Sequence, residues 1–121
     1  MSVGYGWTLW LLLQTAMGDA PCGDVDDVLQ RAETALLEWR LDALERHELE
    51  LQSRWSCGEP ATAEELSRAW LIRAAKWEVQ DSNERAGMAW QAAARISPGS
   101  WNPQLGDQLR ERYDAATEAP E

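Results

Sequence analysis

The segment from Trp70 to Pro98 places large and small apolar residues at helical spacing on both sides of a short polar break. Steps of three and four residues separate these positions, which puts each set on one face of an α-helix. Small side chains let two helices approach closely, and large side chains fill the space beside the contact. The segment therefore predicts an antiparallel helical hairpin. The residues that carry the pattern are Trp70, Ala74, Trp77, Ala86, Trp90, Ala93 and Pro98.

This order of residues resembles the tetratricopeptide repeat (TPR), with Ala74 at its small position and Trp77 and Trp90 at its two aromatic positions. Arg73 departs from the pattern, which has leucine there, and the match covers about a quarter of the chain. The resemblance implies a scaffold for protein–protein interaction, in which the first helix of each hairpin lines the ligand groove. The partner-binding positions that it implies face away from the Ala74 stripe and are Arg68, Leu71, Ala75 and Glu78.

Length and composition limit the fold to one domain. The chain has 121 residues, of which 45% are hydrophobic, and this suffices for one core but not for two. The formal net charge is −10, and the cations are scattered among acids rather than gathered in a basic stripe. Nucleic acid and anionic lipid are therefore poor partners for this chain. We expect an all-α fold of antiparallel helical hairpins, with about five helices after an N-terminal signal segment.

Residues 1–18 differ from the rest because they carry no charged side chain and hold an apolar run from Trp7 to Leu13. The run has the length of a signal-peptide core and is shorter than the roughly 20 apolar residues that span a bilayer. We expect cleavage after Gly18, which leaves residues 19–121 as a single domain of an exported protein, periplasmic or secreted. The absence of Lys and Arg ahead of the run keeps an uncleaved membrane anchor open as the alternative.

Residues 24–55 carry two apolar stripes of different phase with no Gly or Pro between them, so one long helix and a hairpin both fit the periodicity. An unbroken helix would hold the ends of this segment about 45 Å apart, whereas a disulfide needs Cα atoms within about 7 Å of each other. In an exported protein, Cys22 and Cys57 are expected to form such a bond. We therefore predict a first hairpin over residues 24–55, with its turn between Glu38 and Asp42 and a disulfide joining its ends.

Local signals set the remaining helix boundaries. Thr62 and Glu65 have the spacing of a capping box, in which each side chain satisfies a backbone N–H of the first helical turn. We predict a second hairpin over residues 62–97. Asn102-Pro103 is a cap followed by proline at the first helical position, and it predicts a closing helix over residues 103–116.

The sequence offers no active site. The acidic cluster of Asp24, Asp26 and Asp27 lacks the glycine and the ligand spacing of an EF-hand, so Asp24 is interpreted as a helix cap. His47 lacks the second histidine of a zinc-protease helix and is interpreted as a solvated residue. With both cysteines paired, no nucleophile and base remain, and we expect no catalysis, no metal and no cofactor.

Two functions fit these features. The first is an exported, non-catalytic TPR-like interaction module whose partner is another protein of the bacterial cell envelope, with membrane contact only through an uncleaved signal segment. Trp101, outside the helical pattern, is either an anchor for that partner or a staple that holds a turn against a helix. The alternative is an acidic inhibitor or immunity-type protein that neutralises a basic partner through Glu45, Glu48 and Glu50.

Overall fold

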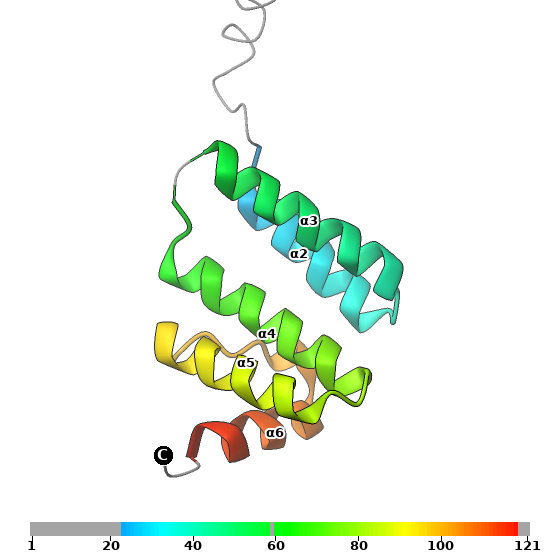
Figure 1. The fold of residues 1–121 in the computed structure, drawn as a ribbon, viewed down its shortest axis with the longest axis vertical. Coiled ribbons are helices and arrows are strands. Elements are labelled where there is room, and N and C mark those ends of the chain that lie inside the picture. Colours follow the sequence, from blue (N-terminus) through cyan, green and yellow to red (C-terminus); the bar gives the residue numbers. More distant parts are fainter. Residues whose placement is uncertain (1–22, 59, 119–121) are drawn as a thin grey trace, which may run out of the picture.

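The computed structural model describes residues 23–58 and 60–118, which form an all-α fold of five helices, as the sequence predicts. In space the helices follow the order α3, α2, α4, α5 and α6, so that α4 lies between the first helix pair and α5 (Figure 1). The predicted signal segment, residues 1–18, lies outside the described part of the chain. The elements are α2 (Val25–Leu37), α3 (Leu41–Cys57), α4 (Ala63–Val79), α5 (Asn83–Ile96), the 3-10 turn η1 (Pro103–Leu105) and α6 (Asp107–Glu118).

The helix starts follow from side chains that cap free backbone N–H groups. The Asp24 carboxylate accepts a hydrogen bond of 3.0 Å from the backbone N–H of Asp26 at the start of α2. At the start of α4, the Thr62 hydroxyl accepts from the N–H of Glu65, and the Glu65 carboxylate accepts from the N–H of Thr62. Both predicted caps are thus present.

Each of the first two helix pairs turns through a residue in the left-handed conformation, Trp39 (φ 60°) and Asp81 (φ 59°). At both turns the next residue donates its N–H to the carbonyl five positions back, from Arg40 to Ala35 and from Ser82 to Trp77. This pattern is the Schellman motif, which satisfies the last carbonyls of a helix. The break predicted between Glu38 and Asp42 is confirmed, and the first hairpin turns by the same chemistry as the second.

The closing segment differs from the single helix predicted over residues 103–116. Asn102 caps it as expected, by accepting from the N–H of Gln104 at 3.0 Å, but only the short turn η1 follows. Gly106 then takes a φ of 93°, which ends the turn before α6 begins at Asp107. A glycine enters this region of backbone space without the strain that a Cβ atom would cause.

Aromatic rings join the closing segment to the second hairpin. Trp90 of α5 is fully buried, and its ring centroid lies 5.8 Å from that of Trp101 and 6.0 Å from that of Tyr113 in α6. Trp101 and Tyr113 are themselves 5.0 Å apart. Trp101 therefore holds the chain between α5 and α6 against the core, which is the staple interpretation of this residue.

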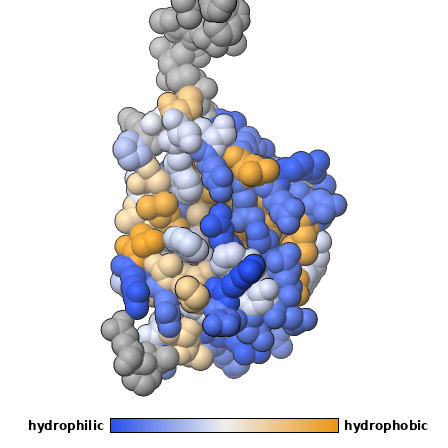
Figure 2. Space-filling model, viewed as in Figure 1, coloured by the Kyte–Doolittle hydropathy of each residue, from blue (hydrophilic) through white to orange (hydrophobic). Residues whose placement is uncertain are grey.

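Small residues lie where α4 and α5 meet, and Ala74, Ala86 and Ala93 are all buried. Ser67 is buried with them and donates its hydroxyl to the carbonyl of Ala93 at 3.0 Å. Away from this core the surface is mainly hydrophilic on the face shown in Figure 2, with apolar residues gathered along its left side and in smaller patches elsewhere. The fold thus depends on one core that runs through the row of helices.

Ala74→Leu and Ala75→Leu should each lower the free energy of unfolding by about 1–3 kcal/mol, because both methyl groups are fully buried and a larger side chain overpacks the site. The sequence alone predicts a milder effect at Ala75, on the face assigned to a partner. Chemical denaturation measures the effect, with Ala115→Leu on the exposed surface of α6 as the control, expected within about 0.5 kcal/mol of the parent protein. Equal stability of the Ala75 and Ala115 variants would contradict the packing described here.

Candidate functional site

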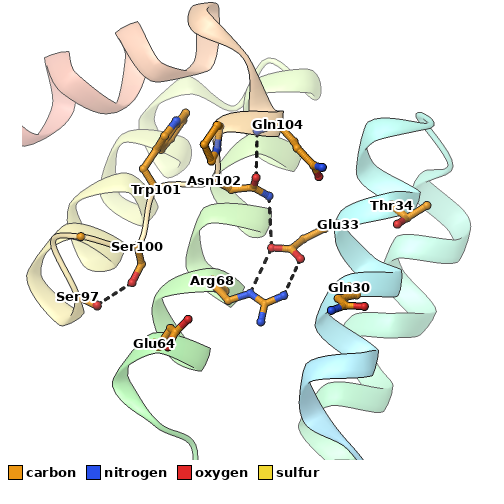
Figure 3. A pocket seen from close by; sticks show the side chains of 12 residues that line it. Gln30, Glu33, Thr34, Glu64, Arg68, Ser97, Ser100, Trp101, Asn102 and Gln104 are labelled. Carbon is orange, nitrogen blue, oxygen red and sulfur yellow. Dashed lines mark hydrogen bonds and ion pairs between the residues drawn. The ribbon is translucent and has the colours of Figure 1, made fainter.

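A groove of about 870 Å³ opens between α2, α4 and the chain that links α5 to α6 (Figure 3). One wall comes from α2 through Gln30, Glu33 and Thr34, and another from α4 through Glu64 and Arg68. The linker, residues 97–104, supplies the third wall. The two helices that line the groove are the first helices of the two hairpins.

An ion pair between Arg68 and Glu33 crosses from α4 to α2 inside this groove (Figure 3). The guanidinium donates to both carboxylate oxygens, at 2.7 and 3.4 Å, and it also contacts Asp26. The two side chains are only 18% and 14% exposed. From the linker, Asn102 donates to the same Glu33 carboxylate at 3.4 Å, so that one carboxylate is shared by all three walls.

The hydrogen bonds to Glu33 raise the pKa of Arg68 above its ordinary value, against the opposing effect of burial. Arginine is already charged at all ordinary pH values, so the consequence is structural. A guanidinium held by two carboxylates in a fork geometry has little freedom to move. The inner surface of the groove is therefore a fixed contact between two helices, in which two carboxylates share one guanidinium.

Around this ion pair the groove presents polar side chains that are open to solvent. Gln30, Thr34, Glu64 and Gln104 are exposed. Amide, hydroxyl and carboxylate groups of this kind exchange hydrogen bonds readily with the backbone of a peptide. The groove therefore presents hydrogen-bonding groups over a concave surface. Its lining contains no cysteine or histidine.

Of the predicted partner-binding positions, Arg68 and Trp101 line the groove, but Leu71 and Ala75 do not. Leu71 is 2% exposed and Ala75 is 0% exposed. The prediction that they form an open surface is wrong because α4 is covered on two sides, by the first hairpin and by α5. The predicted stripe along α4 thus lies in the core at its middle and is only partly exposed at its ends.

Glu78, the last position of that stripe, lies outside the groove. Its carboxylate accepts a hydrogen bond of 3.3 Å from the indole N–H of Trp90, and it lies 3.7 Å from the guanidinium of Arg112 in α6. Its side chain is 12% exposed. Glu78 therefore holds neighbouring helices together.

The acids assigned to the inhibitor alternative are mostly engaged within the molecule. Glu48 accepts from Lys76 at 2.7 Å and lies 3.5 Å from Arg73, which joins α3 to α4. Glu50 accepts from Arg31 on both oxygens, at 3.1 and 3.0 Å, which joins α3 to α2. Of the three, only Glu45 is exposed, and Glu48 and Glu50 are partly buried and paired within the molecule.

The α2 wall of the groove was not among the predicted site residues, although the sequence contains a signal for it. Glu33 lies four residues after Leu29 and three before Leu36, within the apolar stripe of its helix. Glu48 interrupts the stripe of α3 in the same way. A charged residue in register with buried ones needs a partner of opposite charge, and both acids have one.

The remaining predicted features concern metals, membranes and the disulfide. His47 is partly buried rather than solvated, with Nδ1 3.8 Å from the carboxylate of Glu50. In the described ranges no cluster of three or more His, Cys, Asp or Glu side chains is arranged to hold a metal, and no helix is long and apolar enough to cross a membrane. Cys22 lies outside the described residues, so its pairing with Cys57 stays a prediction.

One described contact bears on that pairing. The backbone of Gly23, next to Cys22, lies against the guanidinium of Arg54, so closely that a Cβ atom at position 23 would overlap it. Arg54 lies one helical turn before Cys57 on α3. The hairpin thus brings the two ends of its sequence together, which is the proximity that a disulfide requires.

Neither the models of protein families, nor the curated proteins, nor the solved structures contain a match to this chain. Inference about function therefore depends on the residues and contacts described above.

The ion pair between Arg31 and Glu50 predicts how the free energy of unfolding changes with pH. Hydrogen bonds from Arg31, and next from Arg54, hold the pKa of Glu50 below its ordinary value, although burial opposes them. A carboxylate whose pKa is lower in the folded state stabilises the fold above the unfolded pKa of about 4.3, and this contribution is lost as the pH falls through the folded value. The stability of the parent protein should therefore fall more steeply below about pH 5 than that of Glu50→Gln.

Urea denaturation at a series of pH values measures this difference. Glu45→Gln, at an exposed acid of the same helix, is the control and should keep the parent slope. Identical slopes for the parent and Glu50→Gln would show that the Arg31–Glu50 contact does not stabilise the folded state.

Proposed function

We propose that this chain is a non-catalytic, TPR-like protein-interaction module that binds a polypeptide segment of another protein in the groove between α2 and α4. The observation that carries the proposal is the groove itself. It is concave, polar and lined by the first helices of both hairpins. In the TPR resemblance these first helices are the ones that contact the ligand.

The similarity of the two hairpins supports the repeat interpretation. Both turn through a Schellman motif centred on Trp39 or Asp81, and a buried alanine, Ala32 or Ala74, precedes each of these residues by seven positions. The aromatic positions of the repeat are present only in the second hairpin, where Trp77 and Trp90 occupy them. The first hairpin is thus a unit of the same construction with different side chains.

The chemistry of the groove favours an extended peptide as the ligand. Its exposed amides and hydroxyls can pair with the N–H and C=O groups of a peptide backbone, which alternate along an extended chain. The fixed Arg68–Glu33 pair gives this surface a shape that exists before binding, so that the protein itself loses little conformational entropy when it binds. Both features suit recognition better than catalysis.

We place the partner in the bacterial cell envelope, because the apolar segment before Gly18 has the length of an export signal. In that oxidising compartment Cys22 and Cys57 would form a disulfide that closes the first hairpin. The inhibitor alternative has less support, since two of the three acids assigned to it pair within the molecule.

Affinity capture from an envelope fraction tests the groove when it compares two matched variants. Thr34→Arg adds a long cation to the groove wall, and Ser53→Arg adds the same side chain to the exposed surface of α3. We expect a partner that is retained by the parent and by Ser53→Arg and reduced at least about tenfold by Thr34→Arg, since an obstructed groove loses more than about 1.4 kcal/mol of binding. Thermal melts should show both variants folded.

Retention of every specific partner by Thr34→Arg at the parent level would overturn the proposal. Equal loss by both variants would also overturn it, because binding would then depend on the total charge of the molecule rather than on the groove.

A further inference from the structure

Trp39 is the largest of the strongly exposed apolar side chains on the described surface. It is 68% exposed, at the turn between α2 and α3, and neighbouring Leu37 is also exposed. Its φ of 60° lies in the left-handed region, where glycine is the usual residue and a bulky one is strained. A large indole at this position therefore strains the backbone and exposes apolar surface, and it contributes little to the buried core.

A depression of about 590 Å³ lies beside Trp39, at the opposite end of α4 from the groove. Three elements meet there: the α2–α3 turn, the C-terminal end of α4 and one side of α6. Its apolar lining comes from Val79, Leu109 and Ala115, together with the indole of Trp39. The depression thus has the volume to take a side chain, and its lining is both aromatic and aliphatic.

The charge around the depression is negative. Glu78 and Arg112 line it together and lie 3.7 Å apart, so they largely neutralise each other. Glu111 also lines it, is exposed, and has no ion pair within the described part of the chain. Arg40, next to Trp39, is paired with Glu38 at 3.7 Å. One carboxylate in the lining that includes Trp39 is therefore left without a cation.

We propose that this depression binds a lysine or arginine side chain from a segment of a partner protein. An indole face attracts cations, and a carboxylate nearby adds a charged hydrogen-bond acceptor. Aliphatic walls suit the methylene stem that carries a cationic head. The net charge of −10 favours approach of a basic segment and disfavours a second copy of this chain. This surface is separate from the groove, and the proposal does not depend on it.

The indole N–H resonance of Trp39, assigned with Trp39→Phe, reports binding by NMR. The probes are two short peptides, acetyl-Gly-Lys-Gly-Lys-Gly-amide and its counterpart with Glu in place of Lys. The lysine peptide should shift the Trp39 resonance in a saturable way that weakens with added salt, and the glutamate peptide should not. Glu111→Gln, followed through the Trp39 resonance, and Trp39→Gly, followed through the backbone amide resonance of Glu111, should each weaken binding of the lysine peptide by about three- to fivefold.

Two controls separate this site from general attraction and from the groove. Glu45→Gln removes an exposed acid elsewhere, and Thr34→Arg obstructs the groove. After correction for the change in net charge, the lysine peptide should shift the Trp39 resonance of both variants as it does that of the parent. Trp39→Gly should melt no lower than the parent, because glycine suits the positive φ, so its loss of binding reflects the missing indole.

The proposal is overturned if both peptides shift the resonance equally, or if Glu111→Gln and Glu45→Gln weaken binding to the same extent. A Trp39 shift that depends on protein concentration without peptide would identify a second copy as the occupant, and this too would overturn it.

Discussion

The Arg68–Glu33 ion pair joins the two hairpins beside the groove, and the Lys76–Glu48 pair joins them a second time. Each hairpin has its own buried residues, but α2 and α4 are the helices through which the hairpins meet. At this joint the guanidinium of Arg68 donates to both oxygens of Glu33, and Asn102 brings the linker to the same carboxylate. Removing one member of such a pair leaves the other charge partly desolvated without a partner. The contact between the hairpins and the groove beside it therefore both use the carboxylate of Glu33.

Carboxylates repeat this role along the row of helices. Glu50 joins α3 to α2, Glu48 joins α3 to α4, and Glu78 joins α4 to α5 and α6. A chain with a formal charge of −10 thus uses several of its acids inside the molecule, opposite most of its few cations. The acids that remain exposed give a negative field that acts on partners, whereas the paired ones set the geometry.

Local chemistry in the sequence predicted the elements well. The caps at Asp24 and Thr62 depend on interactions within a few residues of the chain, whereas the turn after Leu37 was predicted from the expected pairing of Cys22 with Cys57. The break at Gly106 was missed because Asn102-Pro103 fits the start of a short turn as well as that of a long helix. Boundaries of helices were therefore predictable wherever one local interaction dominated.

Faces of helices were harder to predict than boundaries. The periodicity of α4 groups Leu71 and Ala75 on one side, but it does not say whether another helix covers that side. Burial of that face is a property of how the two hairpins meet. The partner of Glu33 could not be read from sequence for the same reason, because Arg68 lies 35 positions away. Tertiary packing, rather than propensity, decides which polar residues form the groove.

A double-mutant cycle on Arg68 and Glu33 tests the central claim that their contact joins the hairpins. Unfolding free energies of the parent, Arg68→Met, Glu33→Gln and the double variant give the coupling energy between the two side chains. We expect a favourable coupling of about 1–3 kcal/mol, well above the roughly 0.3–0.5 kcal/mol expected for the exposed pair Arg110–Asp114 measured in the same way. A coupling no larger than that of Arg110–Asp114 would contradict the claim.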